Sequence, residues 1–272
     1  MPEIWKSNLL WPIVGHILTT SIEDAWYQAL DIVMTHGRKY LIEAGSYEGQ
    51  HRRTMPLVVE MHNPNVRPLA PLMPEGSNIP PPTTDEKIHA YMEYLISGEK
   101  KPEEHYTYGE DLSWQIEEVI SYYKKHGFGS ACCHMIVGRP EVIFFYNREV
   151  DYEENILVKD RETGEVLVNR HITNRWNCDP LVEVSSQCLR GVDVWVEDNS
   201  IHFWCYFRSQ DLWGGFPENY GGLQLVKEYM ASVLGIEDGA MIASSKDLHV
   251  YEHGWPVALM RIKKSEGILS EK

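Results

Sequence analysis

The stretch CLRGVDVWVEDNSIHFWCYFRS, residues 188–209, contains two strand-like segments joined by a turn. β-Branched and aromatic residues dominate both segments, and the intervening Asp-Asn-Ser is typical of a turn. We predict that the two segments pair as an antiparallel hairpin. This pairing would bring Arg208 back beside Cys188 at the open end of the hairpin.

The sequence on both sides of this hairpin predicts further helices and strands in alternation. Apolar residues recur at helical spacing in four segments, at 18–36, 85–95, 112–123 and about 223–234. Strand-like text occurs in two stretches of 38–64 separated by the polar GQHRR, in 131–146, and in a last strand at 240–245. Ser21 is the expected N-cap of the first helix, and Gly37 its stop. The sequence therefore predicts an α/β (α+β) fold.

The chain is expected to form a single domain over residues 1–272. Its hydrophobic content of 43% is enough to bury a full core. Residues 64–84 are too rich in proline for regular structure, so we expect a surface loop there. The charged segment 147–177 contains a Thr-Gly turn signal and reads as an exposed hairpin insertion.

Composition excludes several classes of function. The net charge is −15, which repels phosphate backbones and anionic lipid at long range, so we expect neither nucleic-acid nor membrane partners. No apolar run has the length of a membrane helix, and we expect a cytoplasmic protein. The five cysteines include no CxxC pair, so we expect neither a disulfide framework nor a metal site. Cys205, in an apolar run, is expected to be a core residue.

Polar residues that can bind a nucleotide are concentrated between Cys188 and Tyr251. A cysteine beside a cation can act as a nucleophile, and a guanidinium can hold a phosphate with two hydrogen bonds, here with help from the Ser209 hydroxyl. Asn219 offers both a donor and an acceptor to the edge of a base. His249 and Tyr251 would lie on one face of an extended segment and could contact a sugar hydroxyl.

These residues lie in motifs that resemble the thymidylate synthase family. FRSQDLWGGFPENYGG at 207–222 and KDLHVY at 246–251 are similar to the family's Arg-Ser-x-Asp, Gly-x-Pro-x-Asn and Asp-x-His-x-Tyr elements. Cys188 stands twenty residues before Arg208, as the family's catalytic cysteine does before its arginine. The text looks most like the shorter, archaeal-type synthases, and Tyr108 lies in a Tyr-Gly element similar to one in that group.

The resemblance implies a role for each matching residue. Cys188 would be the thiolate that adds to carbon 6 of a pyrimidine. The other roles are phosphate binding by Arg208 and Ser209, positioning of the base by Asp211, recognition of the uracil edge by Asn219, contact with the 3′-hydroxyl by His249 and Tyr251, and substrate contact by Tyr108. Taken alone, Cys188 could be a packed structural cysteine, and Asp211 could merely cap a turn.

The sequence also departs from the family pattern. Gln187 precedes the cysteine where the family usually has proline. Tyr91 occupies the position of the family's proton-managing glutamate, and Glu93 is the nearest acid, so Glu93 is the candidate for that catalytic role. Ala131-Cys132 replaces the family's arginine pair. The candidates for the remaining phosphate ligands are therefore Arg52, Arg53, Arg139, Arg170 and Arg175, although a pair such as Arg52-Arg53 is more often a solvated turn than a phosphate clamp.

The resemblance implies reductive methylation of dUMP to dTMP, with 5,10-methylenetetrahydrofolate or a related tetrahydropterin as co-substrate. It also implies a homodimer with shared sites, formed by packing the sheets of two subunits face to face. A pyrimidine nucleotide hydroxymethylase, in which water completes the reaction, is the alternative within the family. A non-catalytic nucleotide-binding relative is the alternative from another class. Asn219 favours uracil, because the family's cytosine-specific members carry aspartate there.

Overall fold

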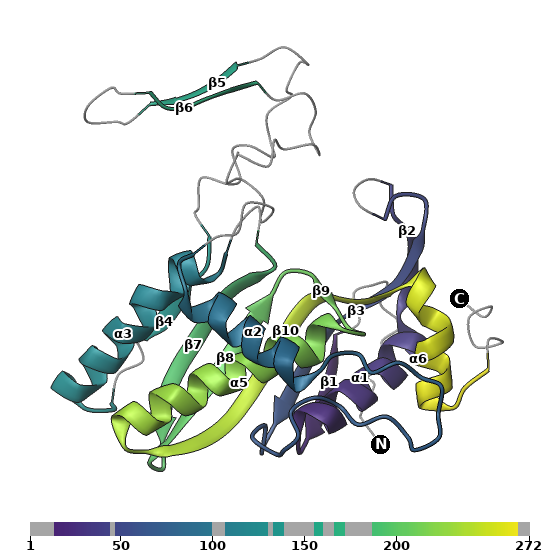
Figure 1. Ribbon diagram of the computed structural model, residues 1–272, viewed down its shortest axis with the longest axis horizontal. Coiled ribbons are helices and arrows are strands. Elements are labelled where there is room, and N and C mark those ends of the chain that lie inside the picture. The colour runs from purple at the N-terminus through teal and green to yellow at the C-terminus, as the bar shows by residue number, and fades with distance from the viewer. Residues whose placement is uncertain are drawn as a thin grey trace.

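The computed structural model describes residues 14–43, 47–99, 107–129, 133–138, 155–159, 166–171 and 187–265. Its main feature is a mixed sheet of eight strands (Figure 1). The strands are β1 (Gly15–Thr19), β2 (Arg38–Leu41), β3 (His51–Met61), β4 (His134–Ile136), β7 (Leu189–Glu197), β8 (Ser200–Phe207), β9 (Gln210–Asp211) and β10 (Glu237–Tyr251). The sheet has the order β1-β3-β10-β8-β7-β4, with β2 paired to β3 and β9 to β10. The pairs β1–β3, β8–β10 and β9–β10 are parallel, whereas β3–β10, β2–β3, β4–β7 and β7–β8 are antiparallel, so the predicted mixed α/β class is confirmed.

Helices cover one face of this sheet. They are α1 (Ile22–His36), α2 (Asp85–Ile96), α3 (Gly109–His126), α5 (Gly215–Leu234) and α6 (Trp255–Ile262), with the short 3-10 helix η1 (Glu252–Gly254) before α6. Strand residues alternate in burial, as the period of two requires. In β8, Phe203 and Cys205 are buried under the helices, whereas Trp204 and Tyr206 are exposed on the opposite face. That opposite face is open to solvent in the single chain.

The hairpin expected at 188–209 is confirmed. β7 pairs antiparallel with β8 from Glu197 and Ser200 at the turn to Leu189 and Phe207 at the open end. Asp198 and Asn199 form the turn with φ values of 48° and 57°, a left-handed conformation that these two residue types tolerate. The hairpin therefore fixes which residues meet at its open end.

Several other boundaries differ from those expected. β10 extends over Glu237–Tyr251 rather than ending at 245, and α5 begins at Gly215 rather than near 223. The added lengths of β10 and α5 contain polar residues that are hydrogen-bonded within the fold, so the hydrophobic pattern did not predict that these residues belong to the strand and the helix. The two strands expected in 38–64 are present as β2 and β3, but only Gly49 and Gln50 of the GQHRR text lie between them, because residues 51–53 belong to β3 and pair with β2. β1 was absent from the expected elements, and its residues had been assigned in part to the first helix, which starts after the confirmed cap at Ser21.

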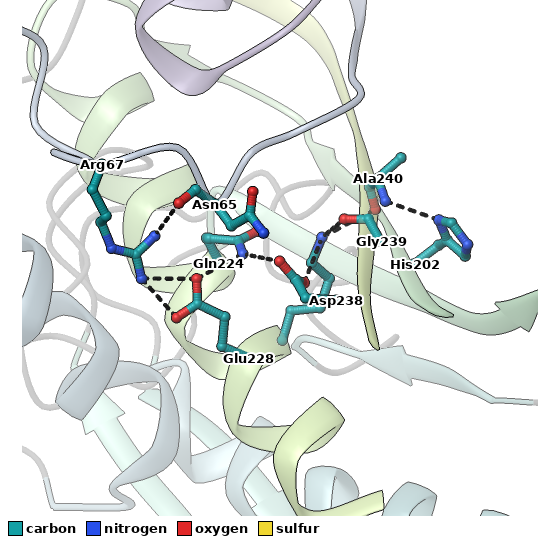
Figure 2. A network of polar contacts seen from close by, with 9 residues as sticks. Asn65, Arg67, His202, Gln224, Glu228, Asp238, Gly239 and Ala240 are labelled. Carbon is teal, nitrogen blue, oxygen red and sulfur yellow. Dashed lines mark hydrogen bonds and ion pairs between the residues drawn. The ribbon is translucent and has the colours of Figure 1, made fainter. Parts of the chain in front are cut away.

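A buried polar network fixes the start of β10 against α5 (Figure 2). The Lys227 side chain is fully buried, and its ammonium group lies 3.1 Å from Asp238 and hydrogen-bonds to the Gly239 carbonyl. Gln224 donates to Asp238 at 2.6 Å and to Glu228 at 2.9 Å. The network therefore pairs a buried charge and orders the backbone where the register of β10 and β8 shifts.

Two expected features lie outside this core. Residues 64–84 contain no helix or strand, and Arg67 connects this segment to α5 through its ion pair with Glu228 (Figure 2). β5 (Asn155–Lys159) and β6 (Val166–His171) pair antiparallel as a separate two-stranded sheet (Figure 1). The rest of 147–177 lies outside the described residues. None of the described helices is long and apolar enough to cross a membrane.

Candidate active site

Cys188 and Arg208 meet at the open end of the β7–β8 hairpin. The Arg208 backbone N–H donates to the Cys188 carbonyl at 2.9 Å, and the Arg208 Nε donates to the Gln187 carbonyl at 3.2 Å. Both residues are half-buried. The arginine is thus fastened to the segment that carries the thiol, as the hairpin predicted.

Cys188 differs from the other cysteines in the described part of the chain. Cys133 and Cys205 are buried, whereas Cys188 is partly accessible. Complete burial raises the pKa of the Cys205 thiol far above its usual range. A thiol in that state does not react, which agrees with the expected core role of Cys205.

Tyrosines from α2 and from the N-cap of α3 pack near the backbone that follows Cys188. The Leu189 backbone N–H donates to the Tyr108 hydroxyl at 3.3 Å, directly after Cys188 in the chain. The Tyr91 ring contacts the Tyr108 ring, with centroids 6.2 Å apart. Glu93 lies on α2 as well, but its side chain is exposed. The structure therefore brings Tyr108 to Cys188, with Tyr91 behind it, and leaves Glu93 at the surface.

Asp211 of β9 and Asn219 of α5 lie on either side of the start of α5. One carboxylate oxygen of Asp211 accepts from the backbone N–H groups of Gly214 and Gly215, each at 2.9 Å, which satisfies free donors at the helix start. Asn219 follows one turn later, and its Oδ1 accepts from Gln210 Nε2 at 3.1 Å. Asp211 thus has the capping role considered from the sequence, and its second carboxylate oxygen is not used by that cap.

Asp247 links the residues expected to hold an anion. Its carboxylate lies 3.0 Å from an Arg52 nitrogen and accepts from the Ser209 hydroxyl at 3.2 Å and from the Thr54 hydroxyl. The pairing of β3 with β10 places Arg52 beside Tyr251, so this arginine reaches the site from the strand that was expected to be a polar turn. Arg52 and Ser209 are therefore held together at one carboxylate.

Arg53 has a structural role instead. It is fully buried and donates to the Met34 carbonyl at 2.9 Å, beneath the end of α1. Of the other arginines considered for phosphate binding, Arg139 and Arg175 lie outside the described residues, and only the backbone of Arg170 is described. Among the candidates with described side chains, Arg52 alone reaches the cluster around Asp247.

His249 is buried with a defined tautomer. Its Nδ1 lies 2.9 Å from the Asp247 carbonyl oxygen, which can only accept, so Nδ1 carries the proton and Nε2 is an acceptor. Burial lowers the pKa of His249 below its usual value, an effect that Asp247 partly opposes. The ring is therefore neutral near pH 7, and within the described residues Nε2 has no hydrogen-bond partner. The Tyr251 ring lies edge-on at 4.7 Å, and burial raises the pKa of Tyr251 to about 12.

A cavity of about 380 Å³ opens beside these residues. Asp211 and Trp213 line one side, and Tyr251 and Val257 contribute to the wall. Tyr47, from the β2–β3 connection, packs on Tyr251 with ring centroids 4.2 Å apart. The cavity thus combines flat aromatic walls with one carboxylate.

Sequence reasoning missed three contributors to this site, namely Gln210, Asp247 and Tyr47. The signal for Asp247 is its place in the KDLHVY motif, two residues before His249. Gln210 lies inside the Arg-Ser-x-Asp motif at its variable position, and nothing in the sequence places Tyr47 here. No group of three or more His, Cys, Asp or Glu side chains in the described ranges could hold a metal ion.

The arrangement defines a class of α/β protein in which a partly accessible thiol and an arginine share a strand end with polar side chains from a neighbouring strand and helix. Comparisons with known proteins agree with the family resemblance of the motifs. The sequence model of the family described as thymidylate synthase matches residues 146–269. Curated relatives from Methanosarcina mazei and Methanosarcina acetivorans, each described as "Putative thymidylate synthase", are 29% identical over 89% of this chain and 92% of their own length.

A solved structure supports the fold. A thermostable thymidylate synthase A from Bacillus subtilis aligns with a TM-score of 0.58 over 90% of this chain and 85% of its own, at 13% identity. In sequence over residues 146–269 and in fold over most of its length, the chain is similar to the thymidylate synthase family, as its motifs indicated.

Proposed function

We propose that this protein is a thymidylate synthase that converts dUMP to dTMP by reductive methylation. The observation that carries the proposal is the position of the Cys188 thiol, partly accessible and beside Arg208 at the open end of the hairpin. Asn219, His249 and Tyr251 approach the same region from α5 and β10. This set offers separate groups for the reacting carbon, the phosphate, the base and the sugar.

In the proposed reaction the Cys188 thiolate forms a bond to carbon 6 of uracil, and carbon 5 becomes nucleophilic. Carbon 5 would then attack the one-carbon unit of the co-substrate and lose its proton, while the bond between that unit and the carrier nitrogen breaks. Transfer of a hydride to the resulting methylene carbon would complete the methyl group and restore the carbon 5–carbon 6 double bond as the thiolate leaves carbon 6. Two electrons are therefore supplied to the transferred carbon by the co-substrate.

The phosphate would be held by Arg208 and Ser209, with Arg52 as a further ligand. All three carry hydrogen-bond donors, and the two arginines add positive charge in a protein whose net charge is −15. Asp247 keeps Arg52 and Ser209 in place before the nucleotide arrives. A phosphate would compete with Asp247 for these donors, so it would bind as the dianion that offers the most acceptors.

The sugar would be recognised by His249 and Tyr251. Because His249 Nε2 is an acceptor in a neutral ring, it suits a hydroxyl donor such as the 3′-OH. The Tyr251 hydroxyl keeps its proton, since burial raises the pKa of Tyr251 to about 12, and it can therefore donate to the same oxygen.

The cavity beside Asp211 fits the flat ring of 5,10-methylenetetrahydrofolate or a related tetrahydropterin. Trp213, Tyr47 and Tyr251 would pack on the ring, and the second Asp211 carboxylate oxygen can accept from a ring N–H group. Bound there, the pterin would supply the one-carbon unit and the hydride. The chain's own residues orient the ring and exclude water around it.

We also propose a homodimer that packs the open sheet faces of two subunits together. Large apolar side chains are exposed on that face, namely Leu18, Ile136, Trp204 and Tyr206. An exposed sheet face that carries several large apolar side chains is typical of a protein interface. The remaining phosphate ligands expected from the resemblance would then come from the second subunit.

One observation favours a hydroxymethylase as the second candidate. Tyr91 replaces an acid on α2, and Glu93 is exposed, so neither places a carboxylate next to Cys188. A site with altered proton transfer could let water rather than hydride complete the reaction. The covalent step at Cys188 is the same in both candidates. A non-catalytic nucleotide-binding relative would keep Arg208 and Asn219 but form no covalent bond.

Product analysis separates these candidates. The protein is incubated with dUMP, and separately with dCMP, in the presence of methylenetetrahydrofolate, and the nucleotide products are identified by mass. A methyl product with an equal amount of dihydrofolate supports the synthase. A hydroxymethyl product supports the second candidate, and tight dUMP binding without turnover supports the non-catalytic relative.

A further inference from the structure

Gln210 contacts the residue proposed to read the base. It lies on β9, pairs with Leu248 of β10, and is 3% exposed. Its Nε2 donates to Asn219 Oδ1 at 3.1 Å. This contact comes from the variable position of the Arg-Ser-x-Asp motif, so it is a property of this chain's own sequence.

The hydrogen bond determines which end of the Asn219 amide faces Gln210. An asparagine amide has an acceptor oxygen and a donor NH₂ group, and rotating it by half a turn exchanges the two. With Oδ1 bound to Gln210, the Nδ2 group points elsewhere. The first turn of α5 lies next to the amide, since a Cβ atom on Gly215 would stand 3.7 Å from Asn219 Oδ1.

The other end of the Gln210 amide makes no such contact. Gln210 Oε1 is buried and has no hydrogen-bond partner among the described residues, whereas Nε2 donates to Asn219 Oδ1. The contact with Asn219 is therefore the interaction through which Gln210 can act on the site.

We propose that Gln210 is a positioning residue that makes the site select uracil over cytosine, through the orientation of Asn219. The inference rests on the proposed function, in which Asn219 reads the base. Uracil has an acceptor oxygen at position 4, and cytosine has a donor amino group there. An Asn219 that presents Nδ2 at this position hydrogen-bonds with uracil and places two donors face to face with cytosine. Turning Asn219 to suit cytosine breaks its bond with Gln210.

The test compares the binding of dUMP and dCMP by isothermal titration calorimetry. In Gln210→Leu the amide of Asn219 is no longer oriented, and we expect the preference for dUMP over dCMP to fall about tenfold, the effect of one lost discriminating hydrogen bond. In Gln210→Glu the side chain can only accept, so it attracts Asn219 Nδ2 and turns Oδ1 toward the base. The preference should fall further or reverse.

Repeating the Gln210 substitution in a second variant, Asn219→Asp, shows whether Gln210 acts through the orientation of the Asn219 amide. Asn219→Asp has no donor end to orient, so adding Gln210→Leu to it should leave the dUMP-to-dCMP ratio unchanged. Thermal unfolding of each variant shows whether it is folded, and Gln210→Met serves in place of Gln210→Leu if the smaller side chain impairs folding.

Three outcomes would overturn the inference. If Gln210→Leu and Gln210→Met weaken both nucleotides equally, Gln210 only supports the fold. If the preference changes by the same factor in the Asn219→Asp background, Gln210 acts by another route. If the wild-type protein prefers dUMP and no Gln210 variant changes that preference, this inference fails alone, whereas a wild-type protein that binds neither nucleotide refutes the proposed function as well.

Discussion

Replacing Arg208 by lysine tests whether the hairpin delivers a phosphate ligand beside the thiol. Arginine presents a planar set of donors, and its Nε is already bound to the Gln187 carbonyl at 3.2 Å, which fixes the plane of the group. Lysine keeps the positive charge but has neither this anchor nor a two-point contact with phosphate. One lost hydrogen bond to a charged group costs about 1.5–3 kcal/mol, so the Kd for dUMP should rise about 10- to 100-fold.

Calorimetry with dUMP and with 2′-deoxyuridine, which lacks the phosphate, measures this effect. Arg208→Lys should weaken dUMP binding and leave deoxyuridine binding within about twofold of the wild-type value. Arg261→Lys is the matched control, because Arg261 lies on α6 and pairs with Glu23 away from the site. Equal losses for both ligands would refute the reasoning, since Arg208 would then act on the fold or the thiol segment rather than on the phosphate.

Three further predictions follow from burial and exposure. Lys227→Met should lower the free energy of unfolding by about 3–5 kcal/mol in urea denaturation, because Asp238 loses its buried partner, and adding Asp238→Asn should recover part of that loss. Burial lowers the pKa of His249 below about 6.5, so as the pH falls from 6.5 toward the folded-state pKa only the unfolded chain takes up this proton, and the free energy of unfolding declines by up to about 1.4 kcal/mol per pH unit. The His249→Gln variant should show a smaller decline in the free energy of unfolding between pH 7 and 5. A decline equal to that of the wild-type protein would contradict the assignment. Trp204→Glu places a charge on the open sheet face and should convert a dimer to a folded monomer in sedimentation velocity, whereas a dimer that persists would place the interface elsewhere.

The sequence was sufficient for the elements with local signals. The hairpin at 188–209 follows from two β-rich segments and a turn, and this hairpin alone places Arg208 next to Cys188. The cap at Ser21 is equally local, because it depends on a side chain and a backbone N–H three residues apart. The spacing of the motifs also indicated the family and predicted the candidate site residues on α5 and β10.

Contacts between distant segments could not be predicted in this way. Arg52 reached the site because β3 pairs with β10, and polar residues in a strand carry no hydrophobic pattern that would reveal that pairing. Glu93 was chosen as the nearest acid in the sequence, yet the turn of α2 leaves it exposed. Gln210 and Asp247 act through contacts with side chains from other parts of the chain, which only the fold brings together.

Trapping with 5-fluoro-dUMP tests the central claim most directly. The fluorine at carbon 5 cannot leave as a proton does, so an enzyme that adds a cysteine to carbon 6 stops as a covalent complex with the nucleotide and methylenetetrahydrofolate. We predict a stoichiometric mass increase that maps to the peptide containing Cys188 and is absent in Cys188→Ala. The Cys188→Ala protein must also be shown to be folded and to bind dUMP, so that the missing adduct reports the loss of the thiol. No adduct in the wild-type protein, or an adduct on Cys133 or Cys205, would contradict the account.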